Sequence, residues 1–206
     1  VRNKVPISIC AEGPRMLQLA GRVGDGVIAG TGLLPEIIKD TTERVYAGAR
    51  EEGRHPSEVE VWFTTRSSLH DDHDTAIENV MASVSSILHH SMKFSLEEKH
   101  VPEELRDQIQ EYVDGYVLYE HVLAEGRNPK RMQELSLADY AIKRFALAGN
   151  AKDWISRIEE IADSGATKLW MNLGGSSPEA EKHYMRVFGE EIMPHFLTQL
   201  NKCRLI

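Results

Sequence analysis

The chain has no long apolar run, few cysteines and no block of positive charge, and each absence narrows what it can be. No stretch of its 206 residues approaches the length of a transmembrane helix. A formal net charge of -8 and the lack of a Lys- or Arg-rich block argue against nucleic acid as the main partner. Cys10 and Cys203 lack metal or redox spacing and fit a reducing, cytoplasmic setting.

The start of the chain, Val1–Val5, also lacks an initiator methionine and an apolar signal region. We therefore expect the chain to begin within a longer protein. Its composition, 41% hydrophobic and 27% charged, is typical of a soluble globular protein with one large core. We interpret residues 1–206 as a single domain, or as a piece of a larger one.

The most informative stretch runs from Pro6 to Thr31 and predicts a strand, a helix and a second strand. Pro6–Ala11 is apolar and β-prone, with Cys10 expected to be buried, and a helix starts near Pro14. Glycine turns follow both strands and lead into helices. Because helix N-termini have unpaired N–H groups, two such turns at one sheet edge can hold a phosphate, although ordinary βα connections give the same spacing.

The rest of the chain repeats this alternation, apart from a helical insertion at 91–147 that shows no strand pattern. The pattern predicts four parallel strands and hence an α/β fold, either an open sheet or half of an eight-stranded barrel. The remaining expected elements are helices at 36–52, 74–90, 135–144, 151–162 and 178–201 and strands at 59–65 and 167–173.

Polar residues at the predicted strand ends are candidates for ligand contacts. Arg66, Ser67 and Ser68 follow the third expected strand, and Asn172 lies at the end of the fourth. Such residues face a ligand or merely solvate a loop. The paired histidines have simpler explanations. The pair at 70 and 73 belongs to a helix-capping loop, and His89 and its neighbour are cations at a helix C-terminus.

No histidine pair has a third residue at metal-ligand spacing, so we predict no metal site. Tyr112, Tyr116 and Tyr119 have the spacing of one helix face, which is consistent with packing or with a dimer contact.

Several motifs, taken in order, resemble the luciferase-like monooxygenase superfamily. The strongest are Ala11–Leu17, Leu19–Gly21 and Gly24–Ile28, and weaker matches lie at 48–54, 149–150 and 162–167. That superfamily comprises the flavin- and coenzyme F420-dependent oxidoreductases that include bacterial luciferase and methylenetetrahydromethanopterin reductase. The resemblance implies a TIM (β/α)8 barrel, of which this chain supplies roughly the last four βα units plus the helical insertion.

The resemblance also implies a site for FMN or coenzyme F420. The cofactor phosphate would meet backbone N–H groups of Glu12 and Gly13 in the first turn and of Gly30, Thr31 and Gly32 in the second. The Glu12 carboxylate would then point away from the phosphate. Some relatives that use F420 have a lysine soon after the second turn, whereas this sequence has leucines at 33 and 34, so the choice of cofactor stays open.

Two functions follow as hypotheses. The first is an oxidoreductase that passes hydride or electrons to a small-molecule substrate or to oxygen, with its acid/base residue in the other half of the barrel. The second is a non-catalytic, truncated or split half-barrel that acts as a binding or assembly module. In either case unpaired sheet edges predict a homo-oligomer, a dimer or higher.

Overall fold

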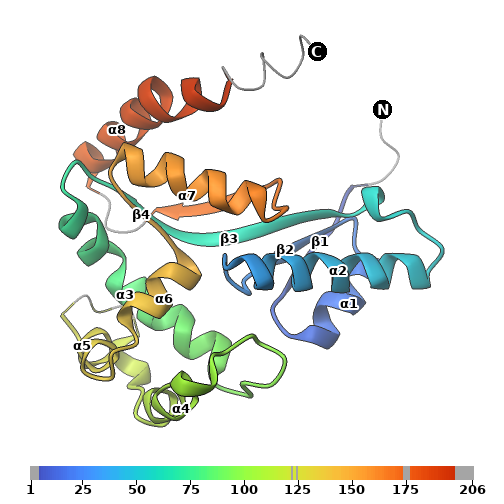
Figure 1. Ribbon diagram of the computed structural model, residues 1–206, viewed down its shortest axis with the longest axis horizontal. Helices are drawn as coiled ribbons and strands as arrows, with labels where there is room; N and C mark the ends of the chain where they lie inside the picture. Colours follow the sequence, from blue (N-terminus) through green and yellow to red (C-terminus); the bar gives the residue numbers. More distant parts are fainter. Residues whose placement is uncertain (1–4, 122, 124, 174–176, 198–206) are drawn as a thin grey trace.

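A computed structural model describes residues 5–121, 123, 125–173 and 177–197 (Figure 1). It is an α/β fold on a five-stranded sheet in which every strand pairing is parallel. The strands are β1 (Ser8–Ala11), β2 (Gly26–Ala29), β3 (Glu60–Leu69), β4 (Ala146–Gly149) and β5 (Leu169–Leu173). The α-helices are α1 (Pro14–Val23), α2 (Pro35–Glu51), α3 (His73–Met92), α4 (Arg106–Asp114), α5 (Arg127–Glu134), α6 (Ala138–Phe145), α7 (Ala151–Asp163) and α8 (Pro178–Val187).

Strand β3 is the centre of the sheet and crosses the middle of the molecule (Figure 1). Its first half pairs with β2, its second half with β4, and its middle with β5. Phe63 pairs with residues of both β2 and β5, and Arg66 with residues of both β4 and β5. Since a strand has only two edges, β2 and β4 lie along one edge of β3 and β5 lies along the other.

The expected β-α-β unit at the start of the chain is confirmed as β1, α1 and β2. Pro14 opens α1 and Pro35 opens α2, each at the first helical position, where a missing N–H costs no hydrogen bond. The expectation that Cys10 is buried is wrong: β1 has only β2 as a neighbour in the described part of the chain, and Cys10 is exposed.

The prediction of four strands is wrong, because β4 was not expected. Its sequence, Ala-Leu-Ala-Gly, has no β-branched residue and lies at the end of the predicted insertion. It is a strand because the second half of β3 offers it a free edge. For the same reason β3 extends to Leu69, so Arg66, Ser67 and Ser68 lie within the strand rather than in a loop after it.

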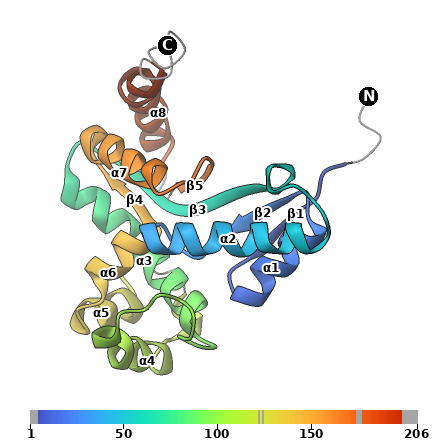
Figure 2. The same cartoon turned by 45° about the vertical axis from the view of Figure 1, so that its right-hand side comes forward.

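Between α3 and β4 the chain is helical, as expected, and forms α4, α5 and α6 below the sheet (Figures 1 and 2). Its buried Tyr112 contacts Ser85 of α3 through its hydroxyl. The expectation that Tyr112, Tyr116 and Tyr119 share one helix face is wrong, because α4 ends at Asp114 and Gly115 caps it.

The two faces of the sheet differ in cover. Along β3 the side chains of Val61, Phe63 and Thr65 are buried against the helical layer, whereas those of Trp62, Thr64 and Arg66 are only part-buried. We call the second side the open face. Strand register adds to it four further residues from the neighbouring strands: Cys10, Ile28, Trp170 and Asn172.

The expected last helix begins at Pro178, as predicted, and continues through a π-helical turn, Phe188–Ile192. The glycine turn expected at 174–176 and the end of that helix after residue 197 lie outside the described residues. No helix within the described ranges has the length and apolar character that crossing a membrane requires.

Helices α1 and α2 cross at glycines. A Cβ on Gly21 would lie 2.0 Å from the Val45 carbonyl oxygen, and one on Gly48 would lie 2.0 Å from the Gln18 carbonyl oxygen. Both contacts are with backbone, which cannot rotate away as a side chain does. This close approach fixes α2 against α1 and so positions the two turns that precede these helices.

Gly21→Ala is therefore expected to lower the free energy of unfolding by about 2 kcal/mol, although alanine favours helices. Gly189→Ala, where a Cβ would meet open space, is the matched control and should change it by less than about 1 kcal/mol. Urea unfolding followed by circular dichroism measures both values. Equal effects of the two substitutions would show that the helix crossing is not tight.

His89, near the end of α3, does not act as a cation favourable to the helix dipole. Its ring stacks on Tyr116 with centroids 3.8 Å apart, and burial lowers its pKa from the usual 6.5. The neutral ring is therefore the folded form, and protonation favours unfolding. Stability from this group is complete above about pH 6.5 and is lost as the pH falls through that value towards the folded pKa.

His89→Phe should keep the stacking and reduce the fall in melting temperature between about pH 7.5 and pH 5.5. Thermal melts of both proteins at the two pH values measure this difference. If the substituted protein loses as much stability at pH 5.5 as the parent, His89 is not the titrating group.

Candidate functional site

A cavity of about 770 Å³ lies on the open face, at the carboxyl ends of the strands. The turn after β1, the first turn of α1 and the end of α3 form its sides, with the segment that follows α3. Its floor is the open face of the sheet. Ligands of parallel α/β folds bind at this edge. The polar residues that line it include Glu12, Arg66, His90, Ser91, Lys99 and Asn172.

The first glycine turn opens onto this cavity. Gly13 is the N-cap of α1 and has no side chain to bond the helix N–H groups, and Pro14 follows it. A Cβ on Gly13 would meet no atom within 4 Å, so there is open space in front of it. The N–H groups of the first turn, at Arg15 and Met16, have no acceptor within the helix. An open, uncapped helix N-terminus of this kind has the donors that anions bind in other proteins.

The second turn is less accessible. A Cβ on Gly30 would lie 2.4 Å from the Glu12 carboxylate, so that side chain already covers it. Thr31 is 8% exposed, and its hydroxyl shares a 2.9 Å hydrogen bond with that of Thr41. Gly32 adopts a φ of +119° against Arg144, where a side chain would clash.

Of the five residues predicted to meet a phosphate, Glu12, Gly13 and Gly30 line the large cavity. Thr31 lines a smaller one beside it, and Gly32 lines neither of the two. The two turns are thus neighbours, as predicted. The first is open at the N-terminus of α1, whereas the Glu12 side chain covers the second at Gly30.

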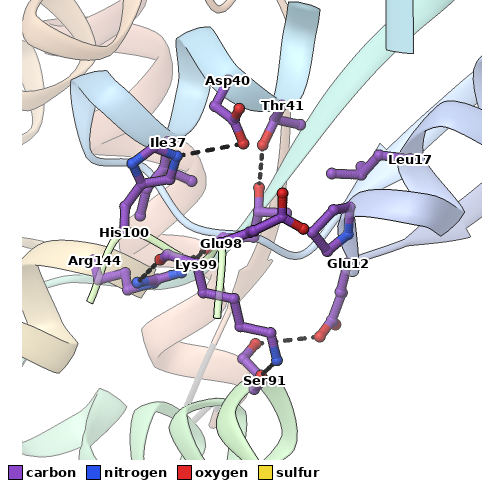
Figure 3. Close-up of a pocket in the computed structure, with 12 residues that line it drawn as sticks. Glu12, Leu17, Ile37, Asp40, Thr41, Ser91, Glu98, Lys99, His100 and Arg144 are labelled. Carbon is purple, nitrogen blue, oxygen red and sulfur yellow. Dashed lines mark hydrogen bonds and ion pairs between the residues drawn. The ribbon is translucent and has the colours of Figure 1, made fainter. Parts of the chain in front are cut away.

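The Glu12 carboxylate lies against the second turn, since a Cβ on Gly30 would be 2.4 Å from it, and it points toward Ser91 (Figure 3). It accepts a hydrogen bond from the Ser91 hydroxyl at 3.2 Å, and its other oxygen is 3.7 Å from His90 Nε2. It therefore places a negative charge where the second turn meets the cavity, and it links β1 to the end of α3.

A small polar cavity of about 20 Å³ lies behind Glu12 and is closed by residues of α2 and of the segment after α3 (Figure 3). His100 Nε2 is 3.3 Å from the Asp40 carboxylate, and Lys99 donates a hydrogen bond to the Ser91 carbonyl. Burial lowers the pKa of Lys99, and the nearby charge of Arg144 lowers it further.

Arg144 of α6 holds the second turn in place. It is 2% exposed and donates two hydrogen bonds to the Thr31 carbonyl, at 3.1 and 3.0 Å. It also donates to the Lys99 carbonyl and to the Tyr140 hydroxyl. Burial lowers its pKa, while Tyr140 and nearby carboxylates oppose that shift. Its role is to join the insertion to the turn after β2.

Asn172 and Arg66, for which the sequence left open a ligand contact or a solvated loop, both line the large cavity. Sequence reasoning missed Arg144, Lys99 and Ser91, which lie in the helical segment far along the chain from the turns that they contact. The one available signal for Arg144 was a cation in a short amphipathic helix, which is ordinarily a solvated residue. His70 and Asp72 form the expected capping loop, in which the Asp72 carboxylate accepts from the Thr75 N–H.

No group of three or more histidine, cysteine, aspartate or glutamate residues suited to a metal ion occurs among the residues that the structure describes.

Comparison with known proteins agrees with this fold. A 5,10-methylenetetrahydromethanopterin reductase of Methanopyrus kandleri is 28% identical over 194 residues, covering 94% of this chain and 51% of the relative. An F420-dependent glucose-6-phosphate dehydrogenase of Microbacterium testaceum is 28% identical over 196 residues, covering 93% and 48%. This chain spans about half the length of the curated relatives that it matches.

Solved structures show the same similarity. The coenzyme F420 dependent tetrahydromethanopterin reductase from Methanopyrus kandleri superposes with a TM-score of 0.69 at 26% identity, covering 93% of this chain and 51% of that one. An F420-dependent secondary alcohol dehydrogenase gives a TM-score of 0.61 at 22% identity, covering 93% and 49%. The second similarity concerns the fold alone.

The model of the luciferase-like monooxygenase family matches residues 1–168, which include both glycine turns, the open face of β1 to β3 and the helical insertion. The chain belongs to the luciferase-like monooxygenase family.

Proposed function

We propose that this chain carries the cofactor-phosphate side of the active site of an FMN- or coenzyme F420-dependent oxidoreductase. The observation that carries the proposal is the uncapped first turn of α1 at Gly13, which opens onto a large cavity at the carboxyl ends of parallel strands. Family membership and the oxidoreductases among its relatives support the same function.

We also propose that the five described strands form part of a TIM (β/α)8 barrel, of which this chain supplies roughly the last four βα units. Strands β1 and β5 each pair on one edge only within the described residues. Val5 and Ile7 beside β1 and Trp170 of β5 are exposed. Further strands that cover these edges would close the barrel and enclose the open face, and the relatives are long enough to contain them.

The residues of the first turn fit a cofactor phosphate. The N–H of Gly13 and those of the first turn of α1 would donate to its oxygens, and the open space at Gly13 admits the phosphate closely. Glu12 and Gly30 would border it through their backbone, while Thr31 and Gly32 hold the second turn in shape through Thr41 and Arg144. When bound, either cofactor supplies transfer of hydride or electrons to a small-molecule substrate.

Between the two cofactors, the relatives favour coenzyme F420, since the names of the Methanopyrus kandleri reductase structure and of the Microbacterium testaceum dehydrogenase include it. Leu33 and Leu34 are both buried in this chain, so no charge from these positions reaches the cavity. The exposed thiol of Cys10 fits a reducing, cytoplasmic setting.

A second candidate function is a non-catalytic half-barrel that acts as a binding or assembly module. The single-sided pairing of β1 and β5 favours it, because unpaired parallel edges associate readily. Both functions predict association, so cofactor binding is what separates them.

Gly13→Asp is expected to weaken binding of FMN and of F420 by about tenfold or more, because it places a negative charge in the proposed anion site. Gly189→Asp adds the same charge at a position with equally open space on the helix after α8 and should leave the affinity unchanged. Titration of the purified chain, followed by cofactor fluorescence, measures the affinities. Binding of neither cofactor to the parent chain would contradict the oxidoreductase proposal.

The open edges should also make the chain self-associate. We expect light scattering after size exclusion to give a dimer or higher, at least twice the 23.2 kDa of one chain. Ile7→Lys, beside β1, should shift the population towards the monomer, because a charge at a strand edge opposes pairing. If the parent chain is a well-folded monomer, its unpaired strand edges do not drive association and the prediction is wrong.

A further inference from the structure

Arg66 differs from the other arginines that the protein encloses. Arg144 and Arg157 each donate to backbone carbonyls and to a further polar side chain. Arg54 likewise donates to carbonyls, here at the C-terminal end of α1. Arg66 is part-buried, and its guanidinium has no hydrogen bond or ion pair with any residue in the described ranges. Its five N–H donors are therefore free to bind a ligand.

The surroundings of Arg66 are those of a binding site. It lies on the open face of β3 and lines the large cavity. Burial lowers its pKa, and the charge of Glu12 opposes that shift without an ion pair between the two. Even so, an arginine stays protonated at any physiological pH. The cavity therefore contains a positive charge that no protein group neutralises by direct contact.

Asn172 lies beside Arg66 on the neighbouring strand. The two residues are register partners in β3 and β5, so their side chains project from adjacent positions of the same face. Asn172 lines the same cavity, and its amide has no hydrogen bond with the described residues. A guanidinium and a carboxamide are thus adjacent with their donors unused.

These two residues lie at the side of the cavity remote from the first turn. Strand β3 is two strands from β1, which is roughly 10 Å at the usual strand spacing, and β5 is one strand farther. A ligand with one end at Gly13 that extends across the sheet would bring its other end to Arg66 and Asn172.

We propose that Arg66 and Asn172 together bind a planar anionic group of carboxylate geometry on the ligand. The guanidinium would donate two parallel hydrogen bonds to such a group, and the Asn172 amide would donate a third. The proposal deepens the proposed function by naming the chemistry at the far end of the same site. The anion comes from a substrate carboxylate or from the anionic edge of a reduced cofactor ring.

The test uses benzoate as the anionic probe and benzamide as its neutral counterpart. The Arg66 Nε–H resonance in a ¹⁵N NMR spectrum of the purified chain should shift with benzoate and not with benzamide. Arg66→Met should abolish benzoate binding, and Arg66→Lys should weaken it about tenfold because an ammonium cannot bind both oxygens in parallel. Arg50→Met removes the same charge from a surface ion pair with Glu43 and should leave binding unchanged.

A second readout separates binding from a structural role. Arg66→Met removes a part-buried charge that has no partner among the described residues, so its melting temperature should equal or exceed that of the parent. A fall of several degrees, or benzoate binding that survives Arg66→Met, would overturn the proposal. Failure of benzoate to bind the parent would also overturn it, even if FMN or F420 binds. Benzoate binding without cofactor binding would instead overturn the proposed function but support the binding site formed by Arg66 and Asn172.

Cofactor titrations then assign the source of the anion. If Arg66→Met weakens binding of the reduced cofactor and not of the oxidised cofactor, the anion is the edge of the reduced ring. If it leaves both redox forms unchanged while benzoate binding is lost, the anion is a substrate carboxylate.

Discussion

The pairing of β3 on both of its edges is the constraint on which the rest of the structure depends. Because its first half pairs with β2, its second half with β4 and its middle with β5, strands from distant parts of the chain end at one edge of the sheet. That edge carries both glycine turns and the pair formed by Arg66 and Asn172. The large cavity lies where these strand ends meet the end of α3 and the segment that follows it.

The site is held together by contacts between the sheet and the helical insertion. Arg144 bonds the Thr31 carbonyl from 113 residues along the chain, and Glu12 bonds Ser91 at the end of α3. The insertion thus fixes the turn after β2 through Arg144, and its first segment supplies Lys99 to the cavity wall. The proposed phosphate side of the site therefore depends on the sheet and the insertion together, although its proposed donors belong to the first turn alone.

Local signals predicted the first half of the fold well. Proline after glycine marked the start of α1, and β-branched and aromatic residues marked the first half of β3. The second half of β3 was hidden by polar residues such as Ser67, and β4 by its small side chains, because pairing with distant strands, rather than local sequence, makes each a strand. Likewise Gly13 and Gly30 were found from local turn chemistry. Arg144 was not, since its partners are backbone carbonyls that no sequence pattern reveals.

The central claim is that the first turn of α1 binds the phosphate of a flavin or deazaflavin cofactor. The most direct measurement is amide hydrogen exchange of the purified chain with and without saturating FMN or F420. The account predicts slowed exchange at Gly13, Arg15 and Met16, with α8 unchanged. Unaltered exchange in this turn together with protection elsewhere would contradict it, because the phosphate would then lie at another site.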